Sequence, residues 1–193
     1  MVNRIDDDAR ELLSLLVGKP IVLIGMMGAG KTTVGRRLAL RLGRTFIDSD
    51  NEVEKAAGMS IADYFAAHGE PEFRAGETRV IARILEEKNI VLGTGGGAFM
   101  TKETRELIKQ RAVSVWIKAD FDLLFARVSK RATRPLLQTE NPRETLKQLI
   151  DARYPTYAKA DVTITSRDVP HDEIAADVID QLSAHLRGKP VTQ

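Results

Sequence analysis

Short apolar runs rich in β-branched residues alternate along the chain with longer stretches in which apolar residues recur every three or four positions. The runs predict five strands, at residues 21–24, 45–47, 90–92, 113–117 and 162–165. The stretches between them predict helices. Strands separated by helices favour a parallel sheet with right-handed crossovers and helices on both faces. We therefore expect an α/β fold with three layers, α/β/α, in which ligands bind beyond the carboxyl ends of the five strands.

The amino-terminal residues form a helical pattern of their own. Apolar residues share one face of residues 4–17: Ile5, Ala9, Leu12 and Leu16. Gly18 and Pro20 then end the pattern. We expect residues 1–19 to form a helical extension packed on a domain of residues 20–186, with a partner-binding helix as the alternative. Residues 187–193 are expected to be a frayed tail.

A polar stretch at residues 129–141, between the last two predicted strands, has no sustained periodicity. It contains Arg134, and it predicts a mobile lid. The helix after it has a well-marked start, because Asn141 can cap it, Pro142 suits the first turn and Glu144 completes a capping box.

Composition excludes several classes of function. The chain has 193 residues, enough for one well-buried core, and a formal net charge of +2, which gives no bulk field for recruiting nucleic acid or an anionic membrane. It has no cysteine, so disulfides and thiolate chemistry are excluded. No run reaches membrane-spanning length, and the acidic start at residues 6–8 is unlike a signal peptide. We expect a cytoplasmic monomer.

The sequence Gly-Met-Met-Gly-Ala-Gly-Lys-Thr at residues 25–32 fits the pattern G-x-x-x-x-G-K-[ST]. It follows the first predicted strand and precedes a helical pattern, which is the setting of a phosphate-binding loop. Glycines let the backbone amides turn toward an anion, Lys31 adds a charge, and the Thr32 hydroxyl can bind Mg²⁺. The motif predicts binding of a nucleoside triphosphate.

Two carboxylates follow the second predicted strand, in Asp48-Ser49-Asp50. Strand alternation would place Asp48 and Asp50 on one side, about 7 Å apart. One could hold the metal through water while the other accepts the proton of an attacking hydroxyl. The alternative is that both only cap a helix that begins near Asn51.

Three consecutive glycines, Gly95, Gly96 and Gly97, follow the third predicted strand. They have no side chains to keep a compact ligand away, although a plain flexible turn is the alternative. Arg74 could pair locally with Glu70 or Glu77 on one helix.

Two other arginines lack such a local explanation. Arg153 has no acidic residue three or four positions away, and Arg127 lies four positions from Arg131, a like-charge pair that an anion would relieve. Arg134 could reach the transferred phosphate from the lid. The three histidines, His68, His171 and His185, have no ligand spacing and are expected at the surface or at helix ends.

The order of these motifs resembles the shikimate kinase family over about residues 20–186. The motifs are the phosphate loop, Asp48-Ser49-Asp50, Phe73-Arg74 with Glu77, Thr94-Gly95-Gly96-Gly97, Arg134-Pro135-Leu136-Leu137, and Arg153-Tyr154-Pro155 through Tyr157 to Ala160-Asp161. The resemblance implies a P-loop kinase fold with a mobile lid. It also implies ATP-dependent phosphorylation of the 3-hydroxyl of shikimate, on the way to chorismate and the aromatic amino acids.

The resemblance also assigns roles by matching positions. Catalytic roles fall to Asp50 as the base, Lys31 and the lid residue Arg134. Acceptor contacts fall to Asp50, Arg74, Gly95, Gly96, Gly97 and Arg153, with Phe65 and Phe73 lining the acceptor pocket. Nucleotide contacts fall to Gly28, Ala29, Gly30, Lys31, Thr32, Thr33, Arg127, Arg134, Arg167 and Pro170, and the Mg²⁺ shell falls to Thr32 and Asp48.

Two other functions fit part of the sequence. A gluconate-type or nucleoside monophosphate kinase would share the loop, although few aromatic residues are available to stack a second base. A nucleotide-gated binding module would share the loop and the lid but has no need of a proton acceptor such as Asp50.

Overall fold

The computed structural model describes residues 2–130 and 140–188. Its elements, in chain order, are α1 (Val2–Leu16), β1 (Ile21–Ile24), α2 (Lys31–Arg41), β2 (Thr45–Asp48), α3 (Ser49–Ala57), α4 (Ile61–Ile84), β3 (Ile90–Gly93), the 3₁₀ turn η1 (Ala98–Met100), α5 (Lys102–Arg111), β4 (Val113–Lys118), α6 (Phe121–Ser129), α7 (Pro142–Tyr157), β5 (Val162–Thr165) and α8 (His171–Leu186).

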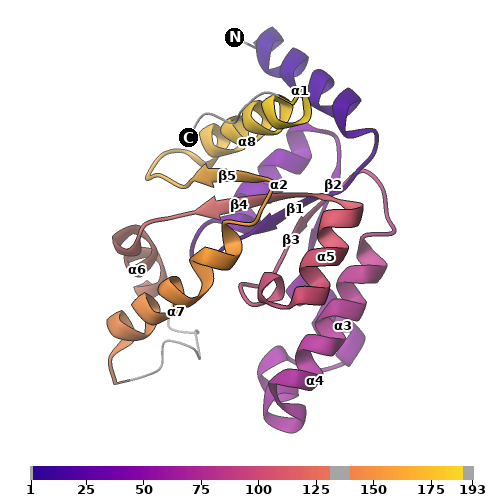
Figure 1. Ribbon diagram of the computed structural model, residues 1–193. Coiled ribbons are helices and arrows are strands. Elements are labelled where there is room, and N and C mark those ends of the chain that lie inside the picture. Colours follow the sequence, from indigo (N-terminus) through magenta and orange to yellow (C-terminus); the bar gives the residue numbers. More distant parts are fainter. Residues whose placement is uncertain (1, 131–139, 189–193) are drawn as a thin grey trace.

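The five strands form one parallel sheet in the order β2-β3-β1-β4-β5. β1 lies at its centre, where Leu23 is paired with Gly93 of β3 and Val115 of β4. The three central strands are almost fully buried, because helices cover both faces of the sheet. In Figure 1, α1, α2 and α8 lie on one side of the sheet, and α4 and α5 lie on the other. The expected three-layer architecture is confirmed.

The amino-terminal helix packs against α8 (Figure 1). Ala9, Leu12 and Leu16 are buried there, as their spacing predicts. Glu11 and Arg187 form an ion pair between the two helices. The extension is therefore integrated into the hydrophobic core of the fold.

Helix α4 contains a break that the sequence analysis did not predict. Gly69 has φ 77° and ψ 173°, which interrupts the helix two residues before Pro71. Glycine tolerates this positive φ, and proline removes a backbone donor just after it. The half of α4 after the break carries Phe73, Arg74 and Glu77 toward the carboxyl edge of the sheet.

The expected lid falls largely on residues 131–139, outside the described residues. Its flanks fit the prediction: α6 ends at Ser129, and α7 begins at Pro142 with the Asn141 side chain accepting a hydrogen bond from the Glu144 amide at 3.2 Å. Among residues 2–130 and 140–188, no helix is long and apolar enough to cross a membrane.

Candidate active site

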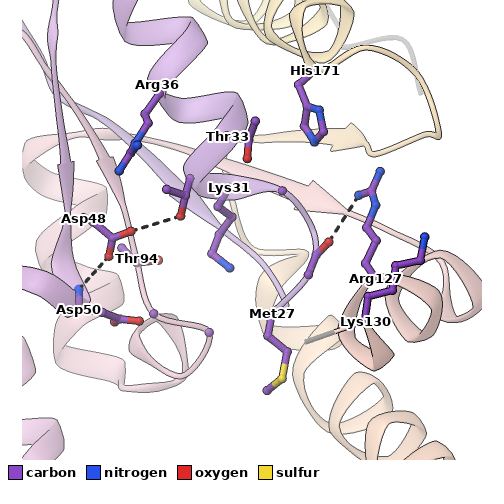
Figure 2. Close-up of a pocket in the computed structure, with 15 residues that line it drawn as sticks. Met27, Lys31, Thr33, Arg36, Asp48, Asp50, Thr94, Arg127, Lys130 and His171 are labelled. Carbon is purple, nitrogen blue, oxygen red and sulfur yellow. Dashed lines mark hydrogen bonds between the residues drawn. The ribbon is translucent and has the colours of Figure 1, made fainter. Parts of the chain in front are cut away.

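A cavity of about 770 Å³ opens beyond the carboxyl ends of β1, β2 and β3, and segments far apart in the sequence line it (Figure 2). The lining residues are Met27, Gly28, Gly30, Lys31, Thr32, Thr33, Arg36, Asp48, Asp50, Thr94, Gly95, Gly96, Arg127, Lys130 and His171. The phosphate loop forms the middle of this wall, Asp50 lies toward one end, and Arg127 and His171 lie toward the other. Its position is the one expected for a ligand site in a parallel α/β sheet.

The residues of the phosphate-loop motif form a strand–loop–helix unit. β1 ends at Ile24, and α2 begins at Lys31, so the amino terminus of α2 faces the cavity. Gly28 and Gly30 have φ of 82° and 100°, values that L side chains rarely adopt. Lys31 Nζ donates to the carbonyls of Gly25 and Met26, at 2.8 and 3.0 Å. Backbone amides, a helix dipole and an ammonium group together make an anion-binding site.

Asp48 and Asp50 both line the cavity, but not through strand alternation. β2 ends at Asp48, and Asp50 already lies in the first turn of α3. Asp48 Oδ1 accepts from the Asp50 amide at 3.1 Å, and Asp48 Oδ2 accepts from the Thr32 hydroxyl at 3.2 Å. Asp48 therefore caps α3, as one of the two alternatives held, and it also lines the cavity.

Burial raises the pKa of the Asp50 carboxyl, and the neighbouring charge of Asp48 raises it further. Lys31 and Arg74 oppose this shift. A carboxyl whose pKa is raised is a stronger base when ionised, which suits the removal of a proton from a hydroxyl.

Thr32 and Asp48 offer a hydroxyl and a carboxylate at the mouth of the phosphate loop. Mg²⁺ prefers oxygen ligands, retains several waters, and is commonly held by one or two protein oxygens together with substrate phosphates. Within the described part of the chain, no three His, Cys, Asp or Glu side chains gather into a metal cage. The donor set fits a Mg²⁺ bound together with a nucleotide.

The triple-glycine loop leaves room for three charged side chains of the protein itself. Gly95 lies against Asp50, Gly96 against Arg153, and Gly97 against Arg74. A Cβ atom on Gly95 would lie 2.5 Å from Asp50 Oδ1, closer than real Cβ contacts, and a Cβ on Gly97 would overlap the Arg74 guanidinium. The loop therefore brings Asp50 and two arginines together in one small region.

Arg74 is held by two acidic residues of α4. Its Nη1 donates to Oε2 of Glu77 at 2.6 Å, and its Nη2 lies 3.3 Å from Oε1 of Glu70. Glu77 is only 2% exposed, and burial raises its pKa while the Arg74 charge lowers it. The Phe65 and Phe73 rings pack together at 4.3 Å and lie beneath the guanidinium. In this structure the two rings support Arg74 and lie outside the lining of the large cavity.

Arg153 comes from α7, far from α4 in the sequence. It lies beside Gly96 and interacts with the hydroxyl of Tyr157, which also donates to the Gly96 carbonyl. Arg153 and Arg74 thus approach the triple-glycine loop from two different helices. Two guanidinium groups next to a carboxylate suit an acceptor that carries both an acid group and a hydroxyl.

The other end of the cavity has a basic wall from α6. Arg127 Nη1 donates to Ser166 Oγ at 3.0 Å, and Arg127 Nη2 donates to the Arg167 carbonyl at 3.1 Å. These bonds tie α6 to the loop that precedes α8. The Arg167 side chain pairs with Asp177 at 2.7 Å, and Pro170 caps α8.

Comparisons with known proteins decide among the kinase families. A model of the family described as shikimate kinase matches residues 27–183. The chain belongs to the shikimate kinase family. A shikimate kinase of Bradyrhizobium diazoefficiens is 54% identical over 183 residues, which cover 95% of this chain and 88% of that relative. A shikimate kinase of Rhodopseudomonas palustris is 53% identical over 180 residues, covering 93% and 89%.

Among solved structures, a shikimate kinase from Acinetobacter baumannii in complex with shikimate is similar to this chain with a TM-score of 0.82 and 39% identity. The match covers 88% of this chain and 95% of that one. The resemblance found in the sequence is therefore confirmed, both as a family and as a kinase fold.

The structure brings together most residues that the shikimate kinase resemblance assigned. The phosphate loop, Asp48, Asp50, Gly95, Gly96 and Arg127 line one cavity. Arg153 lies against Gly96 and Arg74 against Gly97. Arg134 lies outside the described residues. The individual roles of all these residues stay predictions.

Sequence reasoning gave too little weight to Glu77 and His171. Glu77 was considered as a local partner of Arg74 and as part of a family motif but was given no role, yet it is a buried carboxylate beside Gly95. His171 is the first residue of α8, at a helix end as expected, but it also lines the cavity. Its position directly after Pro170, in the segment assigned to the nucleotide, was a signal that could have found it.

Proposed function

We propose that this protein transfers the γ-phosphoryl group of ATP to the 3-hydroxyl of shikimate, giving shikimate 3-phosphate and ADP. The observation that carries the proposal is the position of Asp50, a half-buried carboxylate between an anion-binding loop and two arginines on separate helices. Membership of the shikimate kinase family and similarity to a solved structure that contains shikimate support the same reaction.

In the proposed reaction, Arg74 and Arg153 hold the acceptor carboxylate, and Asp50 accepts a hydrogen bond from the 3-hydroxyl. The hydroxyl oxygen attacks the γ-phosphorus, the bond from that phosphorus to the bridging oxygen of ADP breaks, and the hydroxyl proton passes to Asp50. Lys31 and the loop amides stabilise the charge on the phosphoryl oxygens. Alignment of two bound substrates supplies much of the rate, because it replaces a bimolecular encounter.

Thr32 and Asp48 would hold Mg²⁺, with Asp48 acting through water. The ion would neutralise charge on the phosphate oxygens when it is bound. A lid that includes Arg134 would exclude water, which would otherwise compete as the acceptor.

An ADP-release assay with a small set of acceptors tests this function. We expect turnover with shikimate, little with gluconate or a nucleoside monophosphate, and little ADP release without an acceptor. Asp50→Asn should lower kcat by about 10²- to 10⁴-fold, because the base is lost while the shape is kept. Arg153→Ala should mainly raise KM for shikimate.

Other outcomes would point to the other functions. Comparable turnover of gluconate or a nucleotide would favour another small-molecule kinase. ATP binding without phosphoryl transfer to any acceptor would favour a nucleotide-gated module. Full activity of Asp50→Asn would show that Asp50 does not act as the base.

We also expect the protein to act as a monomer in the cytoplasm. Light scattering during gel filtration would test the monomer at assay concentrations.

A further inference from the structure

His171 lies at the end of the cavity away from Asp50. It is the first residue of α8, and its side chain lies between those of Thr33 and Arg127 in Figure 2. A Cβ atom built on Gly30 would lie 3.6 Å from both Cδ2 and Nε2 of His171, and 3.9 Å from Arg127 Nη1. The imidazole edge that carries Nε2 therefore faces Gly30 of the phosphate loop, and the space between them would hold a single carbon atom.

The rest of the cavity limits what this imidazole can meet. Lys31 and Thr32 lie at the centre of the phosphate loop, and Asp50 marks the acceptor end. If the terminal phosphate of a nucleotide points at Asp50, the rest of the nucleotide must extend along the phosphate loop toward the other end of the cavity. Its α-phosphate and ribose then pass Gly30 and His171 before the base reaches the region of Arg127.

The charges around His171 are mostly positive. Partial burial lowers the pKa of its imidazole, Arg127 on α6 and Arg37 on α2 lower it further, and Asp172 raises it. Asp172 is itself paired with Arg37 at 2.8 Å, and Lys130 lines the same end of the cavity. Without a ligand, these surroundings therefore disfavour the protonated form of His171. An anionic ligand in the cavity would reverse this balance of charge.

We propose that His171 contacts the α-phosphate and ribose of the bound nucleotide and takes up a proton as the nucleotide binds. The proposal rests on the function proposed above, and it adds a nucleotide-binding residue to the ones assigned from the family resemblance. A protonated Nε2–H donates a charge-assisted hydrogen bond to phosphate, which is stronger than a bond from a neutral ring. The contact makes nucleotide affinity depend on pH.

His171→Asn tests the contact, and His185→Asn is the matched control. His185 lies in the last turn of the same helix and does not line the cavity. Calorimetric titration with ADP at pH 6.5 should give a Kd about fivefold higher for His171→Asn than for the wild type, and about the same Kd for His185→Asn. KM for ATP should rise with it, while kcat and KM for shikimate stay within about twofold. Loss of contact with the nucleotide alone produces this split.

The pH dependence separates a titrating contact from simple loss of packing. The ratio of Kd between His171→Asn and wild type should fall toward 1 as pH rises from 6 to 8.5, because the bound imidazole loses its proton. Titration of ADP itself affects both proteins equally and cancels in the ratio. An unchanged Kd in His171→Asn, or a ratio independent of pH, overturns the proposal.

Imidazole NMR of the wild-type protein gives a measurement that does not depend on a variant that folds. The chain has three histidines, so the spectrum is simple. One imidazole should shift on addition of ADP, and its titration midpoint should rise, while the other two stay unchanged. ADP binding needs no acceptor, so these results stand even if shikimate is not phosphorylated. Three unperturbed imidazoles in the presence of saturating ADP would refute the contact.

Discussion

The phosphate loop and the triple-glycine loop each follow a buried strand, and each is rich in glycine for a different physical reason. In the phosphate loop, Gly28 and Gly30 have positive φ. A Cβ on Gly30 would meet only atoms at 3.6 Å or beyond, and a Cβ on Gly28 would meet the apolar side chain of Val128 at 2.8 Å. In the triple-glycine loop no glycine has positive φ, but a Cβ would collide with charged side chains of the protein.

The two loops benefit in different ways from having no side chain at their glycines. The first loop uses backbone freedom, so that its own amides can bind an anion. The second loop uses space, and other elements fill that space with Asp50, Arg153 and Arg74. One loop offers its own backbone to a ligand, whereas the other allows side chains from α3, α4 and α7 to come together.

The same substitution should therefore fail differently in the two loops, and the larger effect is expected in the phosphate loop. Alanine at Gly30 would have to keep a φ of 100°, at a cost of about 1–2 kcal/mol. The loop relieves this strain by turning its amides away from the cavity, and each lost donor to the transferred phosphate costs about 10²- to 10³-fold in rate. We expect kcat/KM for ATP to fall by that factor in Gly30→Ala.

Steady-state kinetics with ATP as the varied substrate measures this effect. Kd for shikimate, from equilibrium titration without nucleotide, should stay close to the wild-type value. An equal loss of shikimate binding would mean that the two loops do not act separately.

Gly97→Ala should affect the acceptor instead. The added methyl group displaces the Arg74 guanidinium, which loses its fork geometry toward a carboxylate. We expect KM for shikimate to rise about 10- to 100-fold while KM for ATP changes little. Gly76→Ala is the control, because Gly76 is helical and a Cβ there meets only ordinary contacts, at 3.8 Å and beyond. If Gly97→Ala raised KM for ATP instead, the displaced arginine would not be an acceptor ligand.

A smaller effect should separate the two acidic partners of Arg74. Glu77 is 2% exposed and Glu70 is 67% exposed, although both contact the same guanidinium. Exposed ion pairs contribute little, whereas a buried partner fixes the position of its arginine. We expect Glu77→Gln to raise KM for shikimate about three- to tenfold and Glu70→Gln to leave it within twofold. Equal effects of the two changes would show that burial does not matter here.

Local sequence predicted the phosphate loop well, because its eight residues are consecutive and one segment contains the whole motif. The acceptor side was harder. The spacing of Asp48 and Asp50 was informative, but β2 ends at Asp48 and the helix that begins there sets their directions. The resemblance to a family supplied the pairing of Arg74 with Arg153, because no local pattern links two residues 79 positions apart.

Burial and long-range packing account for what the sequence did not give. Glu77 is buried because the break at Gly69 redirects α4, and no periodicity in the sequence marks that break. His171 reaches the cavity because α8 packs against α2, next to the phosphate loop. Both depend on contacts between elements, which hydrophobic patterning alone does not specify.

The smallest predicted effect concerns stability and comes from Asp50. Burial and the charge of Asp48 raise its pKa in the folded protein. A group with a raised pKa stabilises the fold fully only below its unfolded pKa of about 3.9, and this contribution is lost as pH rises through the folded value. At pH 7.5 the ionised carboxylate therefore destabilises the fold, and Asp50→Asn removes this destabilisation. We expect the variant to melt about 2–4 °C higher than the wild type at pH 7.5, with the gap closing toward pH 4.

Thermal melts without nucleotide or Mg²⁺ measure this gap, and Asp172→Asn gives the opposite sign as a control. A hydrogen bond from Arg37 lowers the pKa of Asp172, so its ionised form stabilises the fold above its unfolded pKa. Its removal should lower the melting temperature slightly at pH 7.5, because the pair is exposed. Asp50→Asn could instead prove less stable than the wild type at pH 7.5. That result would mean that attraction to Lys31 and Arg74 outweighs the cost of burial, so that the ionised carboxylate stabilises the fold.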